Sequence, residues 1–288
     1  MTETLTLRGI WMKARAALGA LPADEAKRDA RLLIQDALRL TPAQFLAQQS
    51  DPIKVPEGAL EHLEWMIAKR AQRMPISHIQ RNVAFWGRDF EVTGQTLAPR
   101  ADTETLIAAA LDEPFEHLLD LGTGTGCLAI TLLAERKKAR GVATDISPDA
   151  LAVAQRNAVR HRVEDRLDLM ESSWCRDIRG RYDLVVSNPP YIDAEAFERL
   201  APEVRLYEPK QALTPGPTGL EAYRIIISEL SDVLAPGGRV ILEIGFDQAA
   251  AVSHLLQAAG LSQIETRKDL SGKDRVVLAK SGWGGLPG

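Results

Sequence analysis

Residues 118–126 read Leu-Leu-Asp-Leu-Gly-Thr-Gly-Thr-Gly, a short apolar run that ends in a glycine-rich turn. The run is typical of a strand that is buried on both faces, and an apolar helical segment, residues 127–135, follows the turn. Glycines let the backbone turn tightly and approach a ligand closely at the carboxyl edge of an open α/β sheet. The turn therefore predicts a strand–loop–helix unit with a small-molecule site beside it.

Short apolar segments alternate with helical segments from Asp102 onward, which predicts crossover connections and a mostly parallel sheet covered on both faces. The expected strands lie near residues 118–121, 141–144, 167–170, 184–187, 240–244, 263–266 and 276–279. Residues 271–273 are too short a connection for a helix, so the last strand is expected to be antiparallel. We predict an α/β fold, a Rossmann-like domain with a seven-stranded sheet.

The chain is expected to have two domains. Residues 1–75 are expected to form a bundle of four helices. One of these helices should begin at Pro42, with Thr41 as its N-cap. Residues 76–95 are expected to be a β-hairpin connector with Gly87 in its turn. Residues 96–280 would form the α/β domain, and 281–288 a flexible glycine-rich tail.

The composition narrows the class of protein. The 288 residues are 45% hydrophobic and 26% charged with a formal net charge of −4, which does not favour a nucleic-acid backbone or an anionic membrane. No apolar run reaches the ~18 residues that a membrane span needs. The two cysteines form no CxxC pair and the histidines are scattered, so we assign no metal. We expect a monomer in the cytoplasm.

The residues around the glycine turn indicate which kind of ligand it binds. Cys127 stands where the dinucleotide fingerprint needs its third glycine, and no P-loop lysine follows. Asp120, before the turn, would repel a pyrophosphate but suits a positive or ammonium group. Asp145 ends the second strand and is placed to accept ribose hydroxyls, although it could instead be a turn or N-cap acid, a role that Ser147 could also fill. This order resembles the S-adenosylmethionine site of Rossmann-like methyltransferases.

A second motif, Asn188-Pro189-Pro190-Tyr191, closes the apolar run 183–187. The prolines cannot continue the strand, so Asn188 is held at its carboxyl end. The motif resembles that of methyltransferases acting on adenine amines, guanine amines or glutamine amides. The Asn188 side-chain oxygen and the Pro189 carbonyl could accept both N–H bonds of a planar acceptor, while Tyr191 packs on it.

Further motifs extend the resemblance over about residues 20–280. They are Asp29-Ala30, Pro99-Arg100-Ala101-Asp102-Thr103-Glu104, Glu203-Val204-Arg205, Tyr207-Glu208-Pro209 and Leu242-Glu243-Ile244-Gly245. Together they resemble the HemK/PrmC family, the peptide chain release factor glutamine methyltransferases. The resemblance implies N5-methylation of the glutamine in the Gly-Gly-Gln motif of class I release factors, which modulates translation termination. S-adenosyl-L-methionine would be converted to S-adenosyl-L-homocysteine, and the helical domain would dock the protein substrate.

Site residues are assigned position by position. The expected catalytic residues are Asn188, Pro189 and Tyr191, and these with Pro190 would bind the substrate. The expected cofactor-binding residues are Asp120, Gly122, Thr123, Gly124, Thr125, Gly126, Asp145, Trp174 and Asn188. Trp174 would lie near the adenine, although it could be an ordinary core tryptophan. Arg100 and Glu104 could equally form structural ion pairs, and the role of Glu208 is left open. The segment 77–81 lacks a glycine that the family often has.

Three other functions remain open at this stage. A sister family with the same Asn-Pro-Pro-Tyr motif methylates a glutamine of a ribosomal protein. A nucleic-acid amine methyltransferase would be expected to carry a basic face, which the negative net charge disfavours. A non-catalytic binding module would bind the cofactor without turnover.

Overall fold

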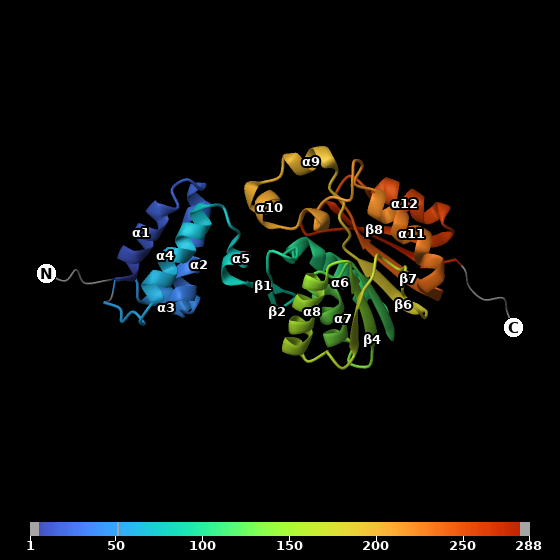
Figure 1. Ribbon diagram of the computed structural model, residues 1–288, viewed down its shortest axis with the longest axis horizontal. Helices are drawn as coiled ribbons and strands as arrows, with labels where there is room; N and C mark the ends of the chain where they lie inside the picture. The colour runs from blue at the N-terminus through green and yellow to red at the C-terminus, as the bar shows by residue number, and fades with distance from the viewer. Residues whose placement is uncertain (1–5, 51, 283–288) are drawn as a thin grey trace. The chain divides into compact units, whose positions relative to one another are not determined.

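The computed structural model describes residues 6–50 and 52–282, which divide into two compact units. The helical unit contains the described residues up to Arg81 together with 202–207, and the sheet unit contains 82–201 and the described residues from Glu208 onward (Figure 1). Residues 1–5 of the predicted helical domain and 283–288 of the predicted tail lie outside the described part of the chain.

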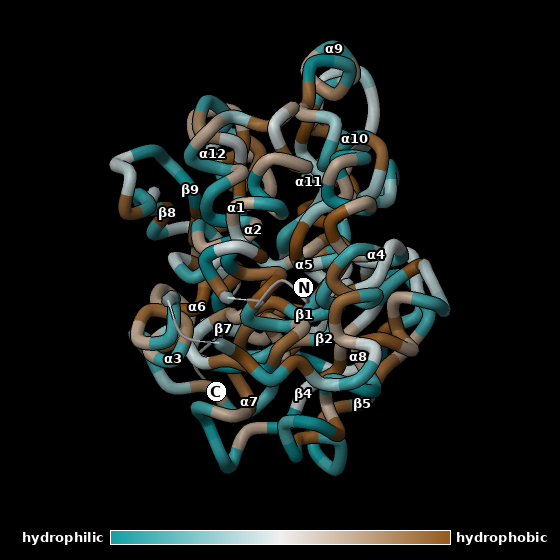
Figure 2. Tube along the Cα trace, turned by 90° about the vertical axis from the view of Figure 1, so that its left-hand side faces the viewer, coloured by the Kyte–Doolittle hydropathy of each residue, from teal (hydrophilic) through white to brown (hydrophobic). Residues whose placement is uncertain are grey.

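The helical unit is built from amphipathic helices that share one core. Their apolar sides bury residues such as Leu33, Ile34 and Met66, which have no exposed surface. Figure 2 shows the corresponding alternation of hydrophobic and hydrophilic bands along the tube. The helices of this core are α1 (Leu7–Ala17), α2 (Ala23–Ala37), α3 (Pro42–Ala47), α4 (Ala59–Ala71) and α5 (Ile76–Gln80). Helix α10 (Pro202–Tyr207) belongs to the same unit but buries none of its residues. Thr41 caps α3 and Pro42 is its first residue, as predicted, and Thr41 also forms a capping box with Gln44.

Helix α5 differs from the predicted connector, which began its hairpin segment at residue 76. Pro75, whose backbone is extended, is the N-cap residue of α5. Ile79, in this helix, is buried in the core of the helical unit. Arg81, with φ of 53°, then ends the helix in the left-handed region. The hairpin itself is confined to β1 (Asn82–Phe85) and β2 (Arg88–Glu91), with Trp86 and Gly87 in the turn.

A buried ionic cluster joins α10 to α2 and α4 within the helical unit. Arg70 donates through Nε to Asp29 Oδ2 at 2.7 Å and through Nη1 to Glu203 Oε1 at 3.2 Å. Tyr207 donates its hydroxyl to the Gln72 carbonyl at 2.6 Å. The chain thus leaves the sheet unit after Ala201, contributes one short helix to the helical unit, and returns at Glu208.

The sheet unit contains a seven-stranded sheet in the order β5-β4-β3-β6-β7-β9-β8. Neighbouring strands from β5 to β7 are parallel, whereas β9 is antiparallel to both β7 and β8, which confirms the predicted antiparallel end. The strands are β3 (His117–Leu121), β4 (Arg140–Asp145), β5 (Leu167–Glu171), β6 (Tyr182–Ser187), β7 (Leu234–Glu243), β8 (Leu261–Lys268) and β9 (Asp274–Ser281).

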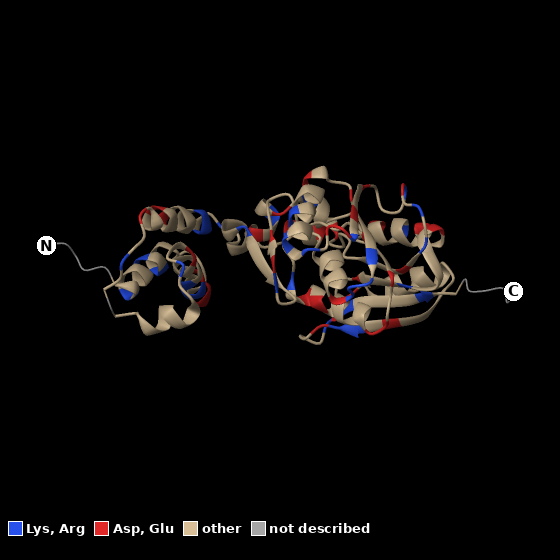
Figure 3. Cartoon of the chain, turned by 90° about the horizontal axis from the view of Figure 1, so that it is seen from below, with Lys and Arg blue, Asp and Glu red and all other residues tan. Residues whose placement is uncertain are grey.

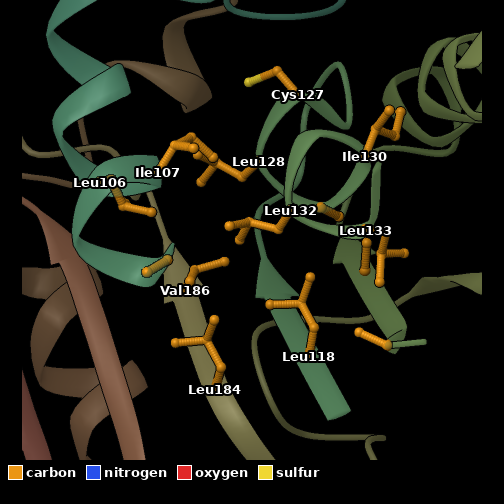
Figure 4. Close-up of a cluster of buried hydrophobic side chains, with 14 of the residues drawn as sticks. Leu106, Ile107, Leu118, Cys127, Leu128, Ile130, Leu132, Leu133, Leu184 and Val186 are labelled. Carbon is orange, nitrogen blue, oxygen red and sulfur yellow. The ribbon is translucent and has the colours of Figure 1, made fainter. Parts of the chain in front are cut away.

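Helices cover both faces of this sheet. One layer contains α6 (Glu104–Leu111), α7 (Cys127–Glu135) and α8 (Pro148–His161), and the other contains α11 (Glu221–Val233) and α12 (Ala249–Ala258) (Figure 1). Strand residues alternate between the two cores, so that Leu118 faces the first and Leu119 the second. Figure 4 shows the first core, with side chains of α6 and α7 over Leu118 and Leu184. Short connecting helices are η1 (Ala101–Thr103), α9 (Ala194–Glu198) and η2 (Lys210–Ala212).

Two further properties of the chain, its distribution of charge and the character of its helices, bear on function. Acidic and basic residues are interspersed along the chain in each unit (Figure 3), in line with a formal net charge of −4. Within the described ranges, 6–50 and 52–282, no helix has both the length and the apolar character needed to cross a membrane.

Candidate active site

The carboxyl ends of three adjacent strands bring the predicted motifs together. Leu121 at the end of β3 pairs with Thr144 of β4 on one side and with Ser187 of β6 on the other. The Ser187 hydroxyl donates to the Leu121 carbonyl at 2.6 Å, which ties β6 to β3 beside the motif that follows. The glycine loop after β3 therefore lies between Asp145 and Asn188, at the edge where open α/β sheets bind ligands.

The glycine loop needs its glycines for conformation and for space. Gly122, Gly124 and Gly126 have φ values of 70°, 55° and 81°, in the left-handed region that side chains rarely adopt. A Cβ atom on Gly126 would lie 2.7 Å from Ile130 Cδ1, and one on Gly122 would lie 3.4 Å from the Trp174 ring. The loop backbone therefore passes close to the first turn of α7 and to Trp174.

Asp120 supports this loop from inside the protein. Its carboxylate has no exposed surface, and Oδ2 accepts hydrogen bonds from the Thr123 hydroxyl at 2.6 Å and from the Ala129 N–H at 3.3 Å. Burial raises the pKa of Asp120 to about 7. The side chain holds the loop in shape and is itself beneath the cavity surface.

Asp145 is held by two backbone donors. Oδ2 accepts from the Gly124 N–H at 2.9 Å and Oδ1 from the Ser147 N–H at 3.0 Å. Ser147, not Asp145, caps α8 by accepting from the Ala150 N–H, whereas the bond from the Ser147 N–H to Asp145 gives Asp145 the turn role that the sequence also allowed. The carboxylate is half-buried, burial raises its pKa, and each oxygen keeps acceptor capacity toward the cavity.

A cavity of about 310 Å³ opens beside these groups within the sheet unit. Its size is in the range of small-molecule sites. The predicted residues that line it are Gly122, Thr123, Gly124, Thr125, Asp145, Trp174, Asn188 and Pro190. Four residues that were predicted from the sequence to belong to the site do not line the cavity: Asp120, Gly126, Pro189 and Tyr191.

Asn188 and Tyr191 differ in how they are held. In the part of the chain that the structure describes, no residue hydrogen-bonds the Asn188 carboxamide, which lines the cavity and is partly exposed. The Tyr191 hydroxyl donates to Glu243 Oε1 at 3.3 Å. Burial, and then the Glu243 carboxylate, raise the pKa of Tyr191, so the phenol stays protonated. The motif therefore combines a free amide with a fixed aromatic ring.

Other lining residues were not nominated from the sequence. They are the segment 95–99 with Thr103, Cys127 and Leu128 of α7, Ile146, Ser147 and Ala150, Ser172 and Ser173, Pro209, Gln211, Ala212 and Pro215, and Glu221, Ala222 and Ile225 of α11. Of these, Pro99 and Thr103 belong to one motif quoted from the sequence and Pro209 to another. The charged residues of those motifs have structural contacts: Arg100 Nη2 lies 2.6 Å from Glu208 Oε1, and Glu104 Oε1 accepts from the Trp86 N–H at 2.7 Å.

The strand order, the glycine loop and the acid at the end of β4 define a Rossmann-like class I methyltransferase. Two solved structures share this fold. The hMettl16 catalytic domain in complex with the MAT2A 3'UTR hairpin 6 has a TM-score of 0.56 at 17% identity, with 80% of this chain and 84% of that one covered. A methyltransferase from Pyrococcus furiosus has a TM-score of 0.52 at 18% identity, with 79% and 100% covered.

Sequence comparison is more specific. The family model "Methyltransferase small domain" matches residues 100–218, and "PrmC N-terminal domain" matches residues 10–80. A release factor glutamine methyltransferase from Cereibacter sphaeroides is 51% identical over 269 residues, covering 92% of this chain and 96% of the relative. Another from Caulobacter vibrioides is 40% identical over 281 residues, covering 96% of each. The chain belongs to the release factor glutamine methyltransferase family, which confirms the resemblance drawn from its motifs.

Proposed function

We propose that this protein transfers a methyl group from S-adenosyl-L-methionine to the side-chain amide nitrogen of the glutamine in the Gly-Gly-Gln motif of class I release factors. One observation carries the proposal. The unpartnered carboxamide of Asn188 and the carboxylate of Asp145 line the same cavity, on opposite sides of the glycine loop. The relatives that match nearly the whole chain bear the name of this activity.

The residues present suit S-adenosyl-L-methionine. Asp145 would accept the two ribose hydroxyls with the acceptor positions that its backbone donors leave free. The loop 122–126 would lie along the methionine part, because its glycine backbone leaves room for close approach. Trp174 would flank the adenine with a ring that borders the cavity. Asp120 would act on the cofactor only through the loop that it supports.

An amide nitrogen is a weak nucleophile, because its lone pair is shared with its carbonyl. The Asn188 side-chain oxygen and the Pro189 carbonyl would accept its two N–H bonds, which aims the lone pair at the methyl group and stabilises the developing positive charge. Tyr191, fixed by Glu243, would pack beside the planar amide. When bound, S-adenosyl-L-methionine would supply a methyl group on a positively charged sulfur, and that sulfur would keep the electron pair of the C–S bond as the N–C bond forms. The methylated nitrogen would then lose one of its two protons to water.

Mass spectrometry of the acceptor tests this function directly. A class I release factor, the ribosomal protein that the sister family methylates, and a mixed RNA pool, the two proteins with their glutamines unmethylated, would each be incubated with the enzyme and S-adenosyl-L-methionine. We expect one methyl group on the Gly-Gly-Gln glutamine, none on a release factor with that glutamine changed to alanine, and none on RNA. Methylation of the ribosomal protein in preference, or of RNA, would overturn the proposed substrate.

Release factors act in translation, so the proposed reaction takes place in the cytoplasm. The interspersed charges and the negative net charge support a protein acceptor over a nucleic acid.

A further inference from the structure

We infer that Gln248 is a positioning residue for methyl transfer, because its carboxamide fixes the backbone of Tyr191 and thereby the aim of Asn188. The inference rests on the proposed function and adds to it a residue that lies outside the cavity lining. Gln248 is the residue immediately before α12, in the loop that follows β7.

The Gln248 carboxamide makes four hydrogen bonds. Nε2 donates to the Tyr191 carbonyl at 2.9 Å and to the Gly219 carbonyl at 3.3 Å. Oε1 accepts from the Gly245 N–H at 2.9 Å and, more weakly, from the Tyr223 hydroxyl at 3.4 Å, whose single proton is shared with the Glu243 carbonyl. An amide has two donors and two acceptor positions, so this set uses all of them. Any rotation of the side chain would break several bonds at once.

Two glycines allow the backbone to come this close. A Cβ atom on Gly219 would lie 2.4 Å from the Tyr191 carbonyl oxygen and 2.9 Å from Gln248 Nε2. A Cβ atom on Gly245 would lie 2.9 Å from Gln248 Oε1. Such distances are too short for real contacts, so three separate loops meet at Gln248 only because both positions are glycine. The two loops that contain Gly219 and Gly245 therefore pass in close contact with the Gln248 side chain.

The Asn-Pro-Pro-Tyr motif is thus held at both ends. Before it, the Ser187 hydroxyl donates to the Leu121 carbonyl. After it, Gln248 holds the Tyr191 carbonyl, and the Ile192 N–H donates to the Leu213 carbonyl at 3.0 Å. Asn188 lies between these points with no hydrogen bond of its own among the described residues. Its orientation therefore depends on the two anchors.

A third contact fixes the ring of Tyr191. Its hydroxyl donates to Glu243, which has 1% of its surface exposed, and the Tyr223 hydroxyl donates to the Glu243 carbonyl at 2.8 Å. Tyr223 thereby contacts both Glu243 and Gln248. The loop after β7 holds the motif through the ring and the backbone together. A misplacement of about 1 Å at a reacting group can slow a reaction about 100-fold.

The consequence for kinetics is specific. Gln248 does not line the cavity, whereas residues 122–125, Asp145 and Trp174, which are proposed to hold the cofactor, do. Loss of its donors should therefore lower kcat and leave cofactor binding nearly intact. A residue with only a structural role would lower the thermal stability and both kinetic constants together.

The test compares Gln248→Glu with Gln257→Glu in the full-length enzyme. The first change keeps the shape, removes both donors and turns a carboxylate oxygen toward two carbonyls. The second makes the same chemical change at an exposed residue of α12, the helix that Gln248 precedes. We expect Gln248→Glu to lower kcat by about 10- to 100-fold, with the dissociation constant for S-adenosyl-L-methionine within about threefold. Hydrogen exchange of the Ile192 amide should accelerate. Gln257→Glu should match the wild type in all three measurements.

Two results would overturn the inference. Unchanged exchange at Ile192 would show that Gln248 does not hold the segment, whatever the acceptor is. Unchanged kcat, in an enzyme whose wild type methylates the release factor, would show that the segment's position does not matter. The wild-type enzyme could fail to methylate the release factor while Gln248→Glu still accelerates exchange at Ile192. That result would refute the proposed function but support the role of Gln248 in holding the segment. If Gln248→Glu does not fold, Gln248→Met is subject to the same criteria.

Discussion

The substitution Arg70→Met should destabilise the helical unit far more than the loss of a surface charge would. Arg70 has 2% of its surface exposed, and it donates to the fully buried Asp29 and to Glu203 of α10. Glu25 is a third partner. After the substitution, the one ion pair that Asp29 keeps among the described residues is with Arg28, whose side chain is 59% exposed.

The magnitude follows from this difference in burial. Removing one partner of a buried ion pair leaves a buried charge and costs about 3 to 5 kcal/mol. Arg28→Met removes the exposed partner of the same carboxylate, and exposed pairs contribute about 0 to 1 kcal/mol. The two arginine substitutions should therefore differ by roughly 2 to 5 kcal/mol in the free energy of unfolding.

Urea unfolding, combined with hydrogen exchange of peptides from α2 and α4, measures this difference. The double variant Arg70→Met with Asp29→Leu should recover most of the lost stability, because a buried pair replaced by apolar side chains is often neutral or stabilising. Equal losses for Arg70→Met and Arg28→Met would refute the reasoning. A double variant as unstable as Arg70→Met would also refute it, because the unpaired Asp29 carboxylate would then not be the cause of the lost stability.

Three further outcomes are expected. Asp145→Ala should weaken S-adenosyl-L-methionine binding about 10- to 100-fold in calorimetry, whereas unchanged affinity would exclude the ribose role. Gly122→Ala should cost about 1 to 3 kcal/mol of stability in urea unfolding, because its φ is 70° and the new Cβ meets Trp174 at 3.4 Å. A wild-type midpoint would remove that explanation. Burial raises the pKa of Asp120 to about 7, so the folded state binds more protons than the unfolded state between about pH 4 and pH 7. The free energy of unfolding should thus fall as pH rises through this range, less steeply in Asp120→Asn, and parallel curves would contradict the assignment.

Local sequence patterns predicted the features that depend on neighbouring residues. The strands were recognised because their apolar runs are short and separated by helical segments, and Asp145 and Asn188 because each follows such a run. Parallel strands bring such positions to one edge, so the pairing of Leu121 with both β4 and β6 was sufficient to unite them.

Contacts between distant loops could not be predicted in the same way. Gln248 follows a motif that the sequence did nominate, yet nothing in its neighbourhood shows that it bonds to Tyr191, 57 positions earlier. Gln211 and Glu221 line the cavity from segments without a recognisable pattern. Asp120 was expected to contact the ligand, but its carboxylate turns inward to Thr123, a choice of rotamer that spacing does not reveal.

The most direct test of the account is the single-turnover rate of methyl transfer by Asn188→Ala at saturating S-adenosyl-L-methionine. We predict a rate at least about 100-fold below that of the wild type, with cofactor affinity within about tenfold, because only the amide that receives the acceptor nitrogen is lost. A rate close to that of the wild type, or an equal loss of rate and cofactor affinity, would contradict the assignment of Asn188 as the group that aims the nitrogen.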